Sequence, residues 1–100
     1  MSKKEKAFEY VVVLIADWWK EQNPNQDFKF NDLSILKIMK ILFLIASVDA
    51  NKDNDGLLNV FDKWYAMPYG HIEKDVWQMI KGKKGVFKNF VISNKALNIK

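Results

Sequence analysis

The sequence predicts a mainly α-helical fold: a small single-domain bundle of three to five helices, with a short β element expected near residues 85–93. The chain has 100 residues, the length of one domain. Apolar residues make up 49% of it, which is enough for one modest core. Its longer segments repeat apolar residues every three or four positions, the spacing of a helix with one buried face. We therefore treat residues 1–100 as one helical domain.

The first helix is expected over residues 5–22. A stripe of apolar residues runs along it at helical spacing: Ala7, Phe8, Val11, Leu14, Ile15, Trp18 and Trp19. The run of three valines at 11–13 weakly favours a strand, but the length of the pattern favours a helix. Asn23 and Pro24 end it, because proline disfavours helix in the residue before it.

A second helix is expected to begin near Asn31 or Asp32, either of which can cap a helix. From Ile41 to Ala46 this segment is apolar on every side. Such a helix lies at the centre of a fold, with neighbours on several sides.

A third helix is expected from His71–Ile72 onward, with Glu73 and Asp75 in its first turn and Gly82 as its C-terminal cap. An aromatic segment, residues 63–70, precedes it. The remaining tail, residues 81–100, contains enough apolar residues for a short strand or a fourth helix.

The composition excludes several functional classes. The chain has no cysteine, which removes disulfides and cysteine-ligated zinc sites. It has one histidine, His71, and no serine in a recognisable nucleophile turn. Its longest apolar runs fall short of the roughly 18–20 residues that span a bilayer. The residues after the N-terminal apolar run do not form a signal-peptide cleavage site. A cytoplasmic location is therefore expected.

Residues 51–62, NKDNDGLLNVFD, have nearly the spacing of an EF-hand calcium loop. The oxygen ligands of this alternative would come from Asn51, Asp53, Asp55, Asn59 and Asp62. Pro68 and Gly70 would end the exiting helix within about two turns. A polar turn explains the same residues without a metal, so we expect no metal or other cofactor and keep calcium as an alternative.

A lysine-rich nucleic-acid-binding domain is a further alternative. The tail from 81 to 100 has six lysines and no acidic residue, and Phe87 and Phe90 could stack on bases. All 16 basic residues of the chain are lysine, however, and arginine is the usual reader of guanine and phosphate. We therefore favour a core position for both phenylalanines.

The stretch 61–77, FDKWYAMPYGHIEKDVW, resembles the signature of the Panacea domain, an antitoxin-like domain of bacterial and phage proteins. The helix motif of that family is similar to residues 36–44, and its segment before the turn is similar to residues 65–70. His71 stands where the family has proline; histidine still fits the first turn of a helix there but fixes the backbone less firmly than proline. The resemblance covers about residues 30–80, and the chain is shorter than the usual family domain.

This resemblance implies a non-enzymatic protein that binds a protein partner, as antitoxins bind toxins encoded beside them. It implies no catalytic residue. Tryptophan and tyrosine are frequent in binding hot spots, and the aromatic segment with its flanks is the predicted contact. The predicted partner-binding residues are Trp64, Tyr65, Met67, Tyr69, His71, Glu73 and Trp77. We expect Trp77 to contribute to the core, and Tyr69 and His71 to lie on the surface.

Overall fold

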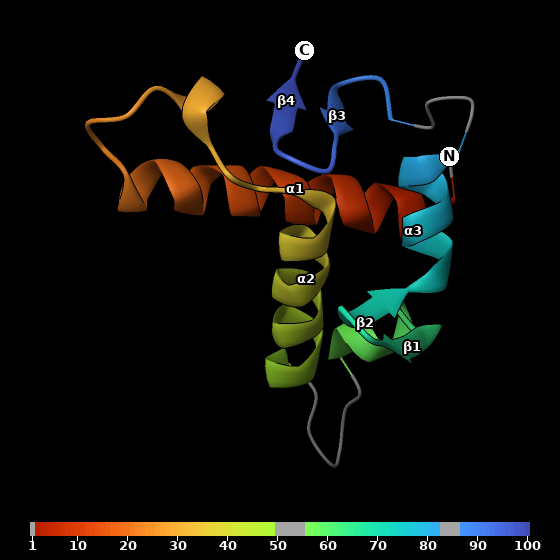
Figure 1. Cartoon of the computed structure of the whole chain (residues 1–100). Coiled ribbons are helices and arrows are strands. Elements are labelled where there is room, and N and C mark those ends of the chain that lie inside the picture. The colour runs from red at the N-terminus through yellow and green to blue at the C-terminus, as the bar shows by residue number, and fades with distance from the viewer. Residues whose placement is uncertain (1, 50–55, 83–86) are drawn as a thin grey trace.

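The computed structural model describes residues 2–49, 56–82 and 87–100. In these ranges it has three α-helices, two short 3-10 helices and two separate two-stranded antiparallel sheets (Figure 1). The mainly helical class with a short β component is therefore confirmed. The elements are α1 (Lys3–Gln22), η1 (Phe28–Phe30), α2 (Ile35–Asp49), η2 (Gly56–Asn59), β1 (Trp64–Met67), β2 (Gly70–Glu73), α3 (Lys74–Lys81), β3 (Phe90–Ile92) and β4 (Leu97–Ile99).

Helix α1 confirms the predicted first helix and extends it toward the N-terminus. Ser2 and Glu5 form a capping box: the Glu5 backbone N–H donates to Ser2 Oγ, and the Ser2 N–H donates to Glu5 Oε1, both at 3.1 Å. The helix ends before Asn23, whose side-chain amide donates to the carbonyl of Trp19 at 2.9 Å. Local signals alone therefore define both ends of α1.

Helix α2 starts later than the sequence predicted. Its cap is Ser34, whose hydroxyl accepts from the Lys37 N–H at 3.2 Å and whose carbonyl accepts from the Ile38 N–H at 2.9 Å. Asn31 is instead buried, and its amide bonds to the carbonyl and the N–H of Leu97 in β4.

Helix α2 runs away from the middle of α1 (Figure 1). The prediction that residues 41–46 have neighbours on several sides is only partly right, because Leu42 and Ala46 are buried whereas Leu44 is 60% exposed.

The predicted start of the third helix was wrong, because residues 64–73 form a β-hairpin. Strands β1 and β2 pair antiparallel, with Trp64 opposite Glu73 and Met67 opposite Gly70. Pro68 and Tyr69 make the turn, and Gly70 has φ +125°, a conformation that glycine adopts without strain. Helix α3 begins only at Lys74, with Glu73 as its N-cap.

The β element expected near residues 85–93 is present as β3, which pairs antiparallel with β4. The Ile35 N–H, at the start of α2, donates to the Ser93 carbonyl at 2.9 Å and joins this small sheet to the helices.

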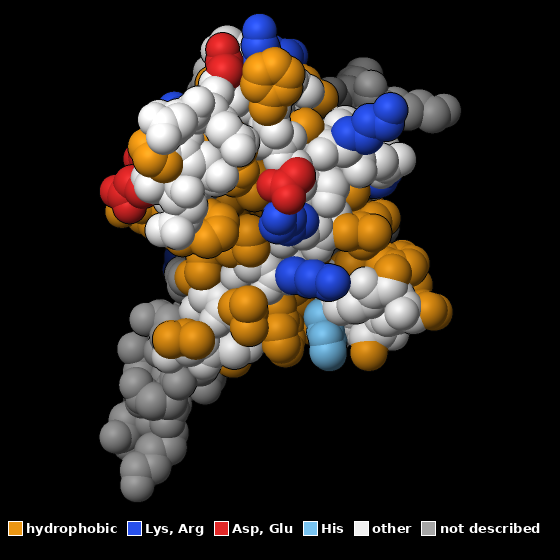
Figure 2. Space-filling model, turned by 60° about the vertical axis from the view of Figure 1, so that its left-hand side comes forward, with side chains coloured by type: hydrophobic (Ala, Val, Ile, Leu, Met, Phe, Trp, Pro, Cys, Tyr) orange, Lys and Arg blue, Asp and Glu red, His pale blue; other side chains and the backbone are white. Residues whose placement is uncertain are grey.

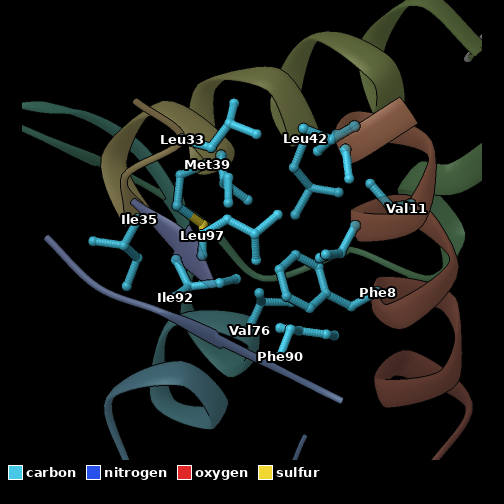
Figure 3. Close-up of a cluster of buried hydrophobic side chains, with 14 of the residues drawn as sticks. Phe8, Val11, Leu33, Ile35, Met39, Leu42, Val76, Phe90, Ile92 and Leu97 are labelled. Atoms are coloured by element: carbon cyan, nitrogen blue, oxygen red, sulfur yellow. The ribbon is translucent and has the colours of Figure 1, made fainter. Parts of the chain in front are cut away.

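One hydrophobic core unites these elements (Figure 3). In the described part of the chain, no helix has both the length and the apolar character needed to cross a membrane. Figure 3 labels core side chains from α1, the α2 region, α3 and the β3–β4 sheet: Phe8, Val11, Leu33, Ile35, Met39, Leu42, Val76, Phe90, Ile92 and Leu97.

Candidate partner-binding surface

The β-hairpin has two faces, and one of them packs on α2. The Trp64 ring meets Phe43 of α2 edge to face at 5.1 Å between centroids, and its Nε1 donates to the Phe61 carbonyl at 2.6 Å. His71 also contacts Phe43: the two rings stack nearly parallel, with 4.4 Å between their centroids. These contacts fix the hairpin against the central helix.

The other face carries exposed aromatic side chains. Tyr65 and Met67 alternate with the residues that face α2, and Tyr69 follows in the turn, where its ring stacks on Trp77 of α3 at 6.0 Å. Tyr65 is 50% exposed and Tyr69 is 44% exposed. The chain therefore holds large apolar rings in water at defined positions.

Two lysines of α3 lie over these rings. Lys74 Nζ is 5.9 Å from the Tyr65 ring centroid, and Lys81 Nζ is 5.5 Å from that of Trp77. Such cation–π contacts orient both the ring and the ammonium group. We call this set the aromatic–lysine surface: Tyr65, Met67, Tyr69, Trp77, Lys74 and Lys81.

The structure divides the predicted partner-binding residues among three places. Three of them lie on the aromatic–lysine surface: Tyr65, Met67 and Tyr69. Trp77 lies there too, and its partly buried side chain also packs against the core, as expected. His71 is exposed, but it lies with the half-buried Trp64 against α2.

The prediction that Glu73 contacts a partner was wrong. Its side chain is fully buried and cannot be offered to a partner. One carboxylate oxygen caps α3 by accepting from the Val76 N–H at 3.0 Å, and the other accepts from Lys4 Nζ at 2.7 Å. The residue has a structural role.

Sequence reasoning missed Lys4 entirely. Its ammonium group, near the start of α1, also donates to Asp62 at 2.9 Å and to Asp75 at 2.8 Å, so that three carboxylates meet one cation. The partners lie 58 to 71 residues away along the chain, and no local pattern marks them. The cluster ties α1 to the hairpin and to α3.

The electrostatics of this cluster favour its charged form. Burial on its own lowers the pKa of Lys4, but the hydrogen bonds to Asp75, Glu73 and Asp62 outweigh it, and the pKa is raised above its usual value. The hydrogen bond from Lys4 lowers the pKa of Asp62. Carboxylate oxygens of Asp62, Glu73 and Asp75 lie within 4.8 Å of one another, close enough for a metal. The lysine ammonium is bonded to all three, so we assign them a structural role.

The helix that an EF-hand requires after its loop is replaced here by strand β1. Asn51, Asp53 and Asp55 lie outside the described residues. Asn59 is exposed at the end of η2, and Asp62 bonds to Lys4. The described geometry therefore does not support the calcium alternative.

Phe87 and Phe90 are buried, each 6% exposed, and both pack on Phe8 of α1. The expected core position of these two side chains is confirmed, and base stacking by them is excluded.

Chemically, the aromatic–lysine surface offers ring faces, a thioether and two ammonium groups. Such a set can cover an apolar patch and pair with carboxylates or phosphates around it.

Comparison of the chain with known protein families, curated proteins and solved structures found no match.

Proposed function

We propose that this chain is a non-enzymatic protein-binding protein, and that the aromatic–lysine surface contacts an acidic protein partner. The observation that carries the proposal is the pair of half-exposed tyrosines, Tyr65 and Tyr69, held on a short hairpin. Ordered aromatic side chains lose little conformational entropy on binding, which is why tyrosine and tryptophan dominate hot spots.

The lysines indicate the charge of the partner. Lys74 and Lys81 flank the rings, and the chain has a net charge of +4. Charges around an apolar contact accelerate association with a partner of opposite sign and select against others. An acidic surface with an apolar centre matches this arrangement.

The more specific role that we propose is that of an antitoxin acting in the cytoplasm. Its support is the resemblance of residues 61–77 to the Panacea signature, and that stretch contains the hairpin and the first half of α3. The partner would then be a toxin encoded beside this chain, and binding alone would neutralise it.

The test is co-expression with the product of the neighbouring gene, followed by co-purification and a growth assay. We expect relief of toxicity and a stable complex. Replacing Tyr65 and Tyr69 together with alanine should weaken the complex by at least about tenfold. Phe30→Ala is the matched control, since Phe30 is a 68% exposed aromatic residue outside this surface. Absence of a complex, or equal binding by the double variant, would contradict the proposal.

Binding of single-stranded nucleic acid is the second candidate, because paired rings and lysines also suit stacked bases. It predicts binding to an oligonucleotide that weakens steeply with salt and is lost in the same double tyrosine variant. Absence of oligonucleotide binding at low salt would eliminate it.

A further inference from the structure

A small hollow lies where the start of β2 meets α2. It has a volume of about 260 Å³ and is lined by Lys40, Phe43 and Leu44 of α2 and by Gly70 and His71 of β2. An apolar cavity of about 150 Å³ holds one benzene molecule, so the hollow has room for one small ring with a substituent. We call it the Lys40–His71 hollow.

The walls of the hollow are mostly apolar, and part of them is flat. The rings of Phe43 and His71 stack at an interplanar angle of 11°. Leu44, with 60% of its surface exposed, lines the hollow with them. Ring faces of this kind stack well on another ring. A planar apolar group is therefore the part of a ligand that these walls fit.

The polar groups of the hollow are two side chains that lack a polar partner in the described part of the chain. Lys40 makes no ion pair, hydrogen bond or cation–π contact there, whereas Lys37, the other lysine of α2, is paired with Asp32. His71 stacks on Phe43, but its ring nitrogens have no hydrogen bond to the described residues. Two donors are thus available at one place.

The end of the Lys40 side chain lies against the hairpin turn. Its Cε is 3.7 Å from the place that a Cβ on Gly70 would take. Because Nζ is bonded to Cε, the ammonium group lies at the Gly70 end of the hollow. Figure 2 shows the histidine beside a lysine side chain, with hydrophobic side chains next to them. A positive charge and an imidazole at the rim of an apolar hollow suit an anion that carries an apolar body.

We propose that the Lys40–His71 hollow binds a small planar organic anion, an aryl carboxylate or an aryl phosphate. The ring of the ligand occupies the apolar part of the hollow, and its anionic group accepts hydrogen bonds from Lys40 Nζ and from the His71 ring. The net charge of +4 also favours an anion. The proposal does not depend on the aromatic–lysine surface, because no residue of that surface lines the hollow.

The first experiment is a titration followed by proton NMR at pH 7. The chain has one histidine, so its imidazole signals report on this hollow alone. We expect benzoate and phenyl phosphate to shift these signals with saturation, and the tighter of the two, which identifies the preferred anionic group, to have a Kd of about 1 mM or below. Benzyl alcohol, which lacks the charge, and inorganic phosphate, which lacks the ring, should each bind at least about tenfold more weakly than the tighter probe.

Two pairs of variants test the lysine and the sign of the charge. Lys40→Gln should weaken binding at least about tenfold. Lys6→Gln is its matched control, since Lys6 is an exposed lysine of α1 outside the hollow. Leu44→Glu should abolish binding by repulsion, whereas Val91→Glu, the same change at an exposed apolar residue of β3, should leave it intact. All four variants keep His71, so the same signals are measured.

Anion binding in the hollow and partner binding by the hairpin are separable. The double alanine variant at Tyr65 and Tyr69 should bind benzoate and phenyl phosphate as the original chain does. Three results would overturn the proposal: imidazole signals that do not shift at about 10 mM of either probe, equal affinity for benzyl alcohol or for inorganic phosphate, or a Lys40→Gln variant that binds as tightly as Lys6→Gln.

Discussion

At the scale of single residues, Lys4 has the largest predicted effect on stability. Replacing it with methionine keeps most of the side-chain length but leaves Glu73 buried without a cation, beside Asp62 and Asp75. Removing one partner of a buried ion pair typically costs about 3–5 kcal/mol. We expect Lys4→Met to lower the free energy of unfolding by about 3 kcal/mol, measured by urea denaturation.

Lys6→Met is the control for this experiment. Lys6 is exposed two residues further along α1, and its substitution should change stability by no more than about 0.5 kcal/mol. Equal stabilities for the two variants would mean that the three carboxylates do not depend on Lys4.

Asn31 shows how far a residue-level signal reaches. The sequence marks it as a candidate cap of the second helix, but the cap of α2 is Ser34. The side chain of Asn31 instead bonds to the Leu33 N–H at the entry to α2, and also to Leu97, 66 residues away. The second contact has no signature in the sequence, because it depends on where β4 packs.

At the scale of elements, the hairpin turn depends on Gly70. Its φ of +125° is strained for any residue with a Cβ, whereas an added Cβ would meet only the end of the Lys40 side chain, at 3.7 Å. The cost of Gly70→Ala is therefore backbone strain, about 1–3 kcal/mol. Thermal melting should show this loss.

Gly82 provides the matched control, because its φ of −62° suits alanine. Gly82→Ala should be neutral or slightly stabilising, since it reduces the freedom of the unfolded chain. If both alanine variants melted alike, the turn conformation described here would be wrong.

The same elements show what the sequence could and could not predict. Helix α1 has 20 residues of clear period and its own cap, so local rules suffice. The hairpin strands have four residues each, and the acidic residues after them, Glu73 and Asp75, look like a helix start. A helix does start there, but only at Lys74. Pro68 and Gly70, which suggested the end of a helix, belong to a hairpin turn. Tyr65 and Tyr69 were predicted from residue type, whereas Lys74 and Lys81 became part of the site only through the fold.

At the scale of the whole molecule, polar contacts join segments that lie far apart in the sequence. Lys4 joins the start of α1 to β2 and α3, and Asn31 with Ser93 joins the start of α2 to the β3–β4 sheet. Both sets of polar contacts lie at the border of one shared core. The domain is therefore expected to unfold as a unit, and the charge on the Lys4 cluster should influence the stability of the whole chain.

The pH dependence of that stability follows from the two shifted groups. The pKa of Asp62 is lowered in the folded state, so its contribution is present above the usual value of 3.8 and is lost as the pH falls below it. The pKa of Lys4 is raised, so its contribution is present below the usual value of 10.5 and is lost as the pH rises through the folded value.

The stability difference between the original chain and Lys4→Met should therefore be widest between about pH 5 and pH 10. It should narrow at both ends: in acid the Asp62 carboxylate becomes neutral, and in alkali the original chain loses the ammonium charge of Lys4. Urea denaturation of both proteins from acid to alkaline pH measures this difference, with Lys6→Met as the reference. A difference that stays constant across the range would show that packing of the Lys4 side chain, and not its charge, stabilises the cluster.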